Sequence, residues 1–173
     1  MNTRKYIGFF IVILLALLET GLAQVGKSAS QSKPDGTHQS HVMLTPEMID
    51  WGKPDPSRPP GLQIVTLAGD PMKEGSPFTI RLKMPDGFVI PPHWHPVDEN
   101  VVVVQGTAMM GTGEKLEHSA AKEMPAGSYG LMPKEMRHYF WAKGETIVHV
   151  YGLGPFKTNW VNPEDRPGKM PKD

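Results

Sequence analysis

Glycine and proline recur at short intervals along this sequence, and their recurrence limits the folds open to the chain. The 173 residues include 18 glycines and 18 prolines, the residue types that helix interiors tolerate least. From Gly61 onward they separate short runs of alternating or β-branched residues, at a spacing of roughly 8–12 residues that is typical of antiparallel sandwiches and barrels. The sequence therefore predicts an all-β domain with strands over residues 62–68, 78–83, 101–104, 107–110, 128–132, 137–142 and 146–151.

Two segments depart from this strand pattern. Residues 114–124 are rich in Ala, Glu and Lys, and they predict either a helical turn or a long loop. Thr45 and Pro46 suit the N-cap and the first position of a helix. That helix must be short, because a proline-rich stretch follows it: Pro54, Pro56, Pro59 and Pro60.

The composition excludes several kinds of chemistry and of partner. The chain contains no cysteine, which rules out disulfides, thiolate metal ligands and cysteine nucleophiles. Lys and Arg total 18, as do Asp and Glu, and the resulting zero net charge argues against a nucleic-acid partner. Any metal site must therefore use histidine and carboxylate ligands.

The first residues have the pattern of a secretory signal peptide. Arg4 and Lys5 precede an apolar run over residues 7–18, and small residues follow at Gly21 and Ala23. A membrane anchor is the alternative, but the apolar run is shorter than the roughly 20 residues that span a bilayer. We expect cleavage after Ala23, a periplasmic or secreted protein, and no stable membrane anchor after cleavage.

The remaining chain is expected to have three parts. Residues 24–60 predict a flexible lead-in, the short helix and a proline-rich arm, residues 61–161 the β domain, and residues 162–173 a C-terminal tail. A single small sheet domain leaves strand edges that need pairing or covering, so a homodimer is expected.

Candidate metal ligands are concentrated in one segment. His93 and His95 are two residues apart, so on a strand their side chains point to the same face, and Glu99 keeps that parity. Paired imidazoles and a carboxylate suit a divalent first-row metal, and His138 could supply a fourth ligand. The alternative is an exposed or aromatic-packed histidine pair that binds no metal.

The wider spacing resembles the two sequence motifs of the cupin superfamily. The first motif matches at every signature position, with set gaps between Gly87, His93, His95, Glu99 and Gly106. The second is partial, with Gly127, Pro133 and His138 in place. Glu135 stands where the family usually has Gly, and Ala142 where it usually has Asn. The resemblance spans about residues 61 to 155 and is greatest to small single-domain bacterial cupins with a signal peptide.

This resemblance implies a small jelly-roll β-barrel that binds one metal through His93, His95, Glu99 and His138. The ion would be a divalent transition metal: Fe, Mn, Ni, Cu or Zn. Asp98 could replace Glu99, but strand parity and the family spacing both favour Glu99. His149 lies in an apolar run and is interpreted as a structural residue whose ring nitrogens are hydrogen-bonded, and not as a metal ligand.

Three imidazoles and one carboxylate leave about two coordination positions open on an octahedral ion, where a small organic substrate could bind. By analogy with the family we expect a metal-dependent enzyme, with dioxygenase-type oxidation first and isomerase or lyase chemistry next. Glu99 is the candidate general base, acting if it leaves the metal when substrate binds. The alternative is a non-catalytic periplasmic module that binds a small molecule or a metal.

Overall fold

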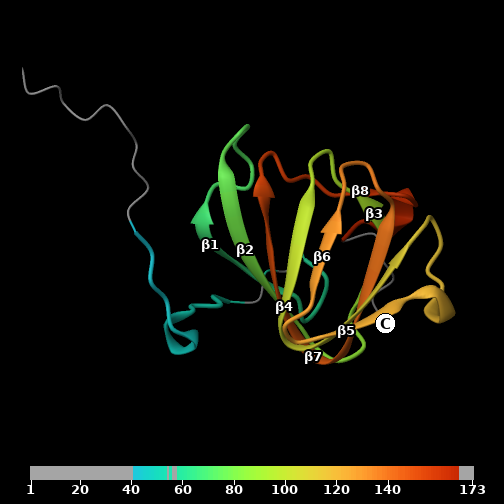
Figure 1. Cartoon of the computed structure of the whole chain (residues 1–173), viewed down its shortest axis with the longest axis horizontal. Helices are drawn as coiled ribbons and strands as arrows, with labels where there is room; N and C mark the ends of the chain where they lie inside the picture. The colour runs from blue at the N-terminus through green and yellow to red at the C-terminus, as the bar shows by residue number, and fades with distance from the viewer. Residues whose placement is uncertain (1–40, 54, 56–57, 168–173) are drawn as a thin grey trace, which may run out of the picture. The chain divides into compact units, whose positions relative to one another are not determined.

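Strands dominate the computed structural model of the protein, which describes residues 41–53, 55 and 58–167 (Figure 1). The all-β class predicted from the sequence is confirmed. The strands are β1 (Gln63–Gly69), β2 (Pro77–Met84), β3 (Val89–Trp94), β4 (Glu99–Thr112), β5 (Lys122–Pro125), β6 (Tyr129–Met132), β7 (His138–Leu153) and β8 (Asn159–Trp160). The described helices are single 3-10 turns: η1 (Pro46–Met48), η2 (His118–Ala120) and η3 (Pro163–Asp165).

The predicted signal peptide at 1–23, most of the lead-in and the end of the tail lie outside the described residues. The short helix expected after Thr45 is the turn η1, with Thr45 at its N-cap position and Pro46 at its start. Within the described ranges, no helix has both the length and the apolar character to cross a membrane.

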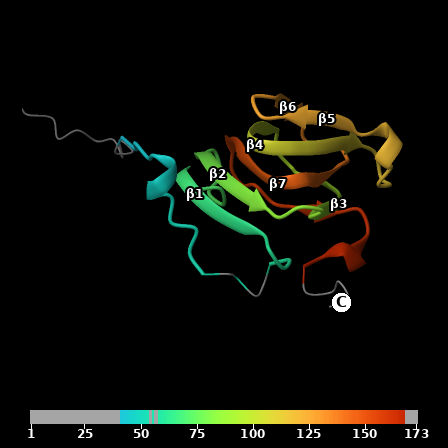
Figure 2. The ribbon, with the colours of Figure 1, turned by 90° about the horizontal axis from the view of Figure 1, so that it is seen from below.

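The sheet is organised around β7, which is paired along both of its edges. One edge of β7 pairs with β4 along most of its length. The other edge pairs first with β3 and then with β2. In Figure 2, β4, β5 and β6 lie on one side of β7, and β1 and β2 lie on the other. All of these pairings are antiparallel, and the sheet curves without closing on itself, as an open form of the expected jelly roll.

The two longest strands differ from the sequence prediction, which divided each of them into two. Residues 101–104 and 107–110 belong to the single strand β4, and its register with β7 shifts on either side of Gln105. Gly106 allows this bulge because it has a φ of 73°, and a Cβ there would lie 2.2 Å from the carbonyl oxygen of Glu145. The bulge lets the ladder continue past a residue that was interpreted as a strand end.

Alternating side chains of the strands form the core. In β2 the buried positions are Phe78, Ile80, Leu82 and Met84, every second residue, as a half-buried strand requires. Facing strands add Val101, Val103, Phe140, Val148 and Val150 to the same cluster. Burying each such side chain stabilises the fold by about 1.5–3 kcal/mol. The continuous apolar packing holds the strands that carry the polar site described below.

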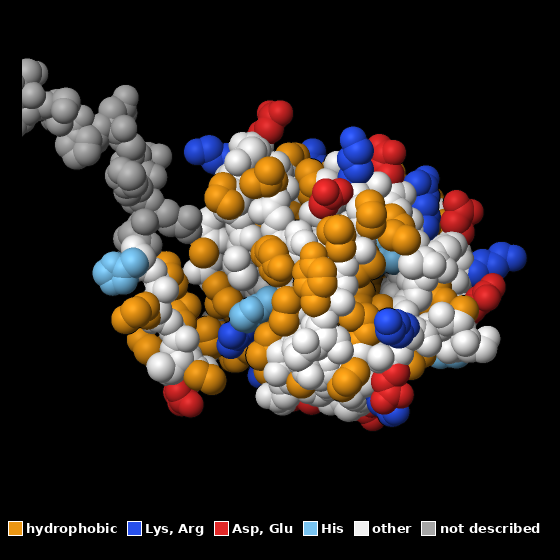
Figure 3. Space-filling view, in the orientation of Figure 1, with side chains coloured by type: hydrophobic (Ala, Val, Ile, Leu, Met, Phe, Trp, Pro, Cys, Tyr) orange, Lys and Arg blue, Asp and Glu red, His pale blue; other side chains and the backbone are white. Residues whose placement is uncertain are grey.

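The outer face of the sheet carries His149, which the sequence interpretation left out of the metal site. Its Nε2 accepts a hydrogen bond of 2.6 Å from Nε of Arg81 on the neighbouring strand β2. On the face of the molecule drawn in Figure 3, acidic and basic side chains are interspersed around apolar ones. His149 is therefore a satisfied residue of the outer face.

Candidate metal centre

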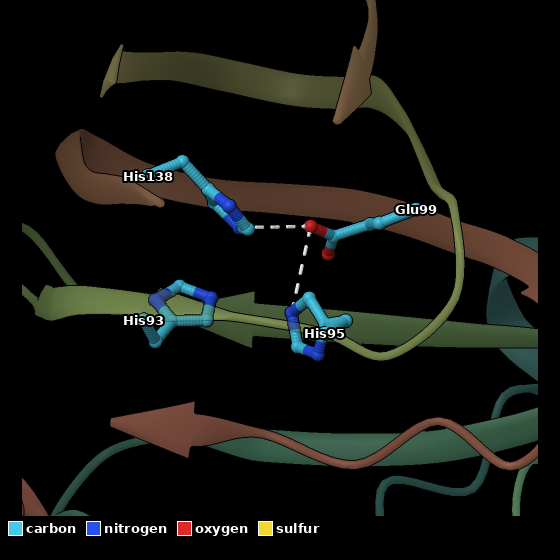
Figure 4. A group of neighbouring side chains, drawn as sticks. All are labelled: His93, His95, Glu99 and His138. Carbon is cyan, nitrogen blue, oxygen red and sulfur yellow. Dashed lines mark ion pairs between the residues drawn. The ribbon is translucent and has the colours of Figure 1, made fainter. Parts of the chain in front are cut away.

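Three neighbouring elements position the four sequence-predicted site residues. His93 is on β3 and lies opposite His138, the first residue of β7, in the register of the two strands. His95 follows directly after β3, and Glu99 begins β4. All four residues are buried, with relative exposures of 3–7%. The structure thus brings together His93, His95, Glu99 and His138, hereafter the ligand group (Figure 4).

The distances within the ligand group suit one metal ion. Glu99 Oε2 lies 3.0 Å from His138 Nε2 and 3.6 Å from His95 Nε2. One nitrogen or oxygen atom from each of the four residues lies within 4.8 Å of the others. Ligand atoms on opposite sides of one ion are about 4.2 Å apart when each bond is about 2.1 Å, so small side-chain movements suffice.

The Nδ1 atom of each imidazole is held by a backbone carbonyl oxygen. Nδ1 of His93 lies 2.7 Å from the oxygen of Pro91, and Nδ1 of His138 lies 3.0 Å from that of Met136. Nδ1 of His95 lies 2.9 Å from the oxygen of Lys157. A carbonyl oxygen only accepts, so each Nδ1 is the protonated donor, which leaves the Nε2 lone pair for a cation.

Nε2 of His95 is buried and has no hydrogen-bond partner. A carboxylate oxygen and an imidazole lone pair that are 3.0 Å apart, as in Glu99 and His138, repel each other unless a cation lies between them. Burying such an unpaired nitrogen or carboxylate oxygen costs folding free energy unless a proton or a metal ion binds to it. The residues present therefore fit a divalent metal.

Burial sets the charge state of these groups. It lowers the pKa of His93 to about 3, and the charges of His138 and His95 lower it further. Burial also lowers the pKa of His95. For Glu99 burial acts to raise the pKa, but a hydrogen bond from His138 and the positive charge that the histidines carry when they are protonated outweigh it, and the pKa is lowered. At neutral pH the group therefore offers a carboxylate with neutral His93 and His95, the forms that bind metals.

The ligand group borders a cavity of about 470 Å³. His93, His95 and Glu99 contribute to its wall. Most of the other lining side chains are apolar, among them Leu62, Ile64, Ile80, Leu82, Phe88 and Ile90. The ligand group therefore lies between the packed core and an apolar cavity.

The segment 155–161, hereafter the strap, closes one side of the site and was not identified from the sequence. Phe156 stacks on the ring of His95, with centroids 4.1 Å apart and an angle of 19°. Trp160 on β8 pairs with His93 on β3. The sequence of the strap offers one hint of this role, the two aromatic residues Phe156 and Trp160. Nothing in the sequence indicates that they contact the ligand group or β3.

The loop before His138 explains one departure from the cupin motif. Glu135, which stands where the motif has Gly, adopts a φ of 64°, in the left-handed region that favours glycine. Its N–H donates a 2.7 Å hydrogen bond to the carbonyl oxygen of His95. The backbone thus keeps the geometry of the motif, although the residue has a side chain.

The neighbouring carboxylate of Asp98 lies outside the ligand group. Its Oδ1 accepts a hydrogen bond of 2.8 Å from the backbone N–H of Lys134, and the residue is exposed. Ala142, the second departure from the motif, is buried in the core.

Solved structures share this fold. The acetylacetone dioxygenase from Acinetobacter johnsonii matches with a TM-score of 0.56 and 19% identity, over 79% of this chain and 87% of that chain. The polyketide cyclase RemF from Streptomyces resistomycificus matches with a TM-score of 0.51 and 15% identity, over 62% and 76%. An RmlC-like cupin from Shewanella frigidimarina matches with a TM-score of 0.51 and 15% identity, over 68% and 95%. The chain has the cupin jelly-roll fold, as the sequence motifs predicted.

Among curated proteins, none matches this sequence. The sequence profile of one family, described as a domain of unknown function, DUF4437, matches residues 24–159. That range includes the whole ligand group and most of the strap. The chain therefore belongs to the DUF4437 family.

Proposed function

We propose that this protein is a metal-dependent enzyme that oxidises a small organic molecule, with dioxygenase-type chemistry as the first candidate and isomerase or lyase chemistry next. One observation carries the proposal. Three imidazoles and one carboxylate converge at one point, and a backbone carbonyl oxygen holds the Nδ1 atom of each imidazole. They lie beside an apolar cavity that is large enough for an organic substrate. The acetylacetone dioxygenase with the same fold supports the choice of oxidation by analogy.

The proposed ligands of the metal are His93, His95, Glu99 and His138. Such an ion supplies Lewis-acid polarisation of a substrate oxygen and, if it is Fe, Mn, Ni or Cu, access to oxygen chemistry. The chain itself orients the imidazoles through the carbonyl oxygens and excludes water with the apolar wall. Glu99 is the proposed proton acceptor once it leaves the metal on substrate binding, because it is the carboxylate among the described residues of the cavity wall.

A binding module without catalysis is the second candidate. The same apolar wall suits retention of a small molecule in the cavity without its conversion. The two candidates differ in turnover and not in metal or ligand binding.

Oxygen uptake separates them. Metal-free protein is loaded in turn with Fe, Mn, Ni, Cu and Zn and mixed with a panel of diketones and catechols under air. We expect at least one redox-active metal to give uptake above the free-metal background, and the His138→Ala variant to give none. Ligand binding with no turnover of any compound, under air or without oxygen, would favour the binding module.

We further propose that the protein is exported, on the basis of the signal-peptide pattern at 1–23. N-terminal sequencing of natively produced protein should begin at Gln24. A chain that keeps its first residues and sediments with membranes would contradict both cleavage and the predicted loss of an anchor.

A further inference from the structure

The size and wall of the cavity restrict what can fill it. Its volume of about 470 Å³ is in the range of pockets that enclose drug-sized molecules, and acetylacetone would occupy only a small part of it. Aromatic side chains from separate segments contribute to the wall: Phe88, Phe156 and Trp160. A ligand that excludes water from this space must have a sizeable apolar body.

Ionisable groups lie at two different depths of this cavity. His93, His95 and Glu99 are almost fully buried and mark its inner end. Arg58 is the only Lys or Arg among the described lining residues, and its side chain is 36% exposed, which places it at the rim. A ligand that extends from the ligand group to the solvent would therefore meet one fixed positive charge.

Two contacts hold the guanidinium of Arg58 at this rim. Its Nη1 donates a 3.2 Å hydrogen bond to the carbonyl oxygen of Ile64 on β1. Its Nε lies 3.2 Å from Oδ2 of Asp55 in an exposed ion pair. Exposed pairs of this kind contribute about 0–1 kcal/mol, so a ligand carboxylate can share or replace Asp55 at small cost. Guanidinium groups bind carboxylates through parallel N–H donors, and the bond to Ile64 pre-orders the side chain.

We propose that the cavity selects amphipathic organic anions. The apolar body of the ligand fills the cavity, a carboxylate at one end binds Arg58, and the other end reaches the ligand group. Arg58 is then a specificity-determining residue, and Asp55 weakens its attraction for anions. This inference deepens the proposed function, because it names the class of substrate for the same site.

The experiment uses metal-free protein, so that its outcome does not depend on the metal. The probes are 2-naphthoate and its neutral isostere 2-naphthamide, titrated by calorimetry at neutral pH. A charge-assisted hydrogen bond predicts that the wild type prefers the carboxylate by about tenfold. Arg58→Gln should abolish the preference and leave the affinity for the amide unchanged. Arg58→Lys should keep part of the preference, and Asp55→Asn should increase it.

Lys83→Gln is the matched control, since Lys83 lies over the ring of Trp51 and not in the cavity wall. It should leave both affinities unchanged. Three results would overturn the inference: no binding of either probe, no preference in the wild type, or a preference that survives in Arg58→Gln. If purified protein holds no metal yet shows the Arg58-dependent preference, the proposed enzyme fails and the anion specificity stands.

Discussion

Nδ1 of His95 lies 2.9 Å from the carbonyl oxygen of Lys157, a residue 62 positions further along the chain. The preceding residue of the strap, Phe156, stacks on the same imidazole. The strap therefore fixes both the tautomer and the orientation of His95. Contacts from residues that do not themselves bind the metal affect metal affinity, because they fix the direction in which the ligand atom points.

Phe156→Ala should weaken metal binding by about tenfold, because the ring of His95 loses the surface that orients it. Competition with a chromophoric chelator measures the Zn²⁺ affinity, and circular dichroism checks that the variant is folded. Leu153→Ala, at an exposed position at the end of β7, is the control and should bind as the wild type does. Equal affinities in all three proteins would refute a positioning role for Phe156.

Glu99→Gln should lower both metal content and turnover, since an amide lacks the charge that balances a divalent ion and cannot accept a proton from substrate. Asp98→Asn is a close control, because Asp98 is the adjacent carboxylate and lies outside the ligand group. Elemental analysis and oxygen uptake are measured on both variants. If Glu99→Gln retains the metal content and activity of the wild type, Glu99 is neither ligand nor base.

Acid should destabilise the metal-free protein. The pKa of His93 is about 3 in the folded state, and that of His95 is also lowered, whereas histidine in the unfolded chain titrates near its usual pKa of 6.5. Below that value the unfolded chain binds more protons, so stability is lost as the pH falls, by at most about 1.4 kcal/mol per pH unit for each histidine. The lowered pKa of Glu99 acts in the same direction when the pH falls below the usual pKa of glutamate, 4.5.

Urea unfolding in steps of roughly one unit from about pH 7 to about pH 5 measures this slope. His93→Gln should make the slope shallower, because it removes one of the groups that titrates differently in the two states. A slope that is the same in His93→Gln and in the wild type would contradict the assignment to His93.

Glu135→Gly should raise the free energy of unfolding by about 0.5–1 kcal/mol, because glycine adopts the left-handed φ of this position without the steric cost that a side chain adds. Lys134→Gly, one residue earlier, has no such strain to relieve and should lower stability by a similar amount. Urea unfolding of both variants gives the comparison. If both variants lose a similar free energy of unfolding, Glu135 is not strained.

The ligand group was predictable because the sequence features that identify it lie in two short motifs. His93, His95 and Glu99 lie within one short segment, where strand parity predicts a shared face, and the second motif pointed to His138. The carbonyl oxygen of Lys157 was not predictable, since its contact with His95 depends on where the chain returns after β7. Short motifs identify metal ligands better than they identify the groups that orient them.

Most strands were predictable because alternation and turn residues are also local features of the sequence. The predictions were wrong where pairing between strands outweighs the local preference of the residues. Gly106 was interpreted as an end of a strand, but in β4 it forms a bulge that leaves the ladder intact. Residues 114–124 were predicted to form a helical turn or a long loop, yet the end of that segment belongs to the edge strand β5 (Lys122–Pro125), which pairs with β4. The two-residue strand β8 has no sequence signature of its own. The signal peptide, export and the homodimer stay predictions.

Elemental analysis of natively purified protein tests the central claim most directly. We predict close to one divalent transition-metal ion per chain in the wild type, the same content in His149→Ala on the outer face, and almost none in His138→Ala. A wild-type protein without stoichiometric metal, whose melting temperature does not rise when divalent ions are added, would contradict the metal centre.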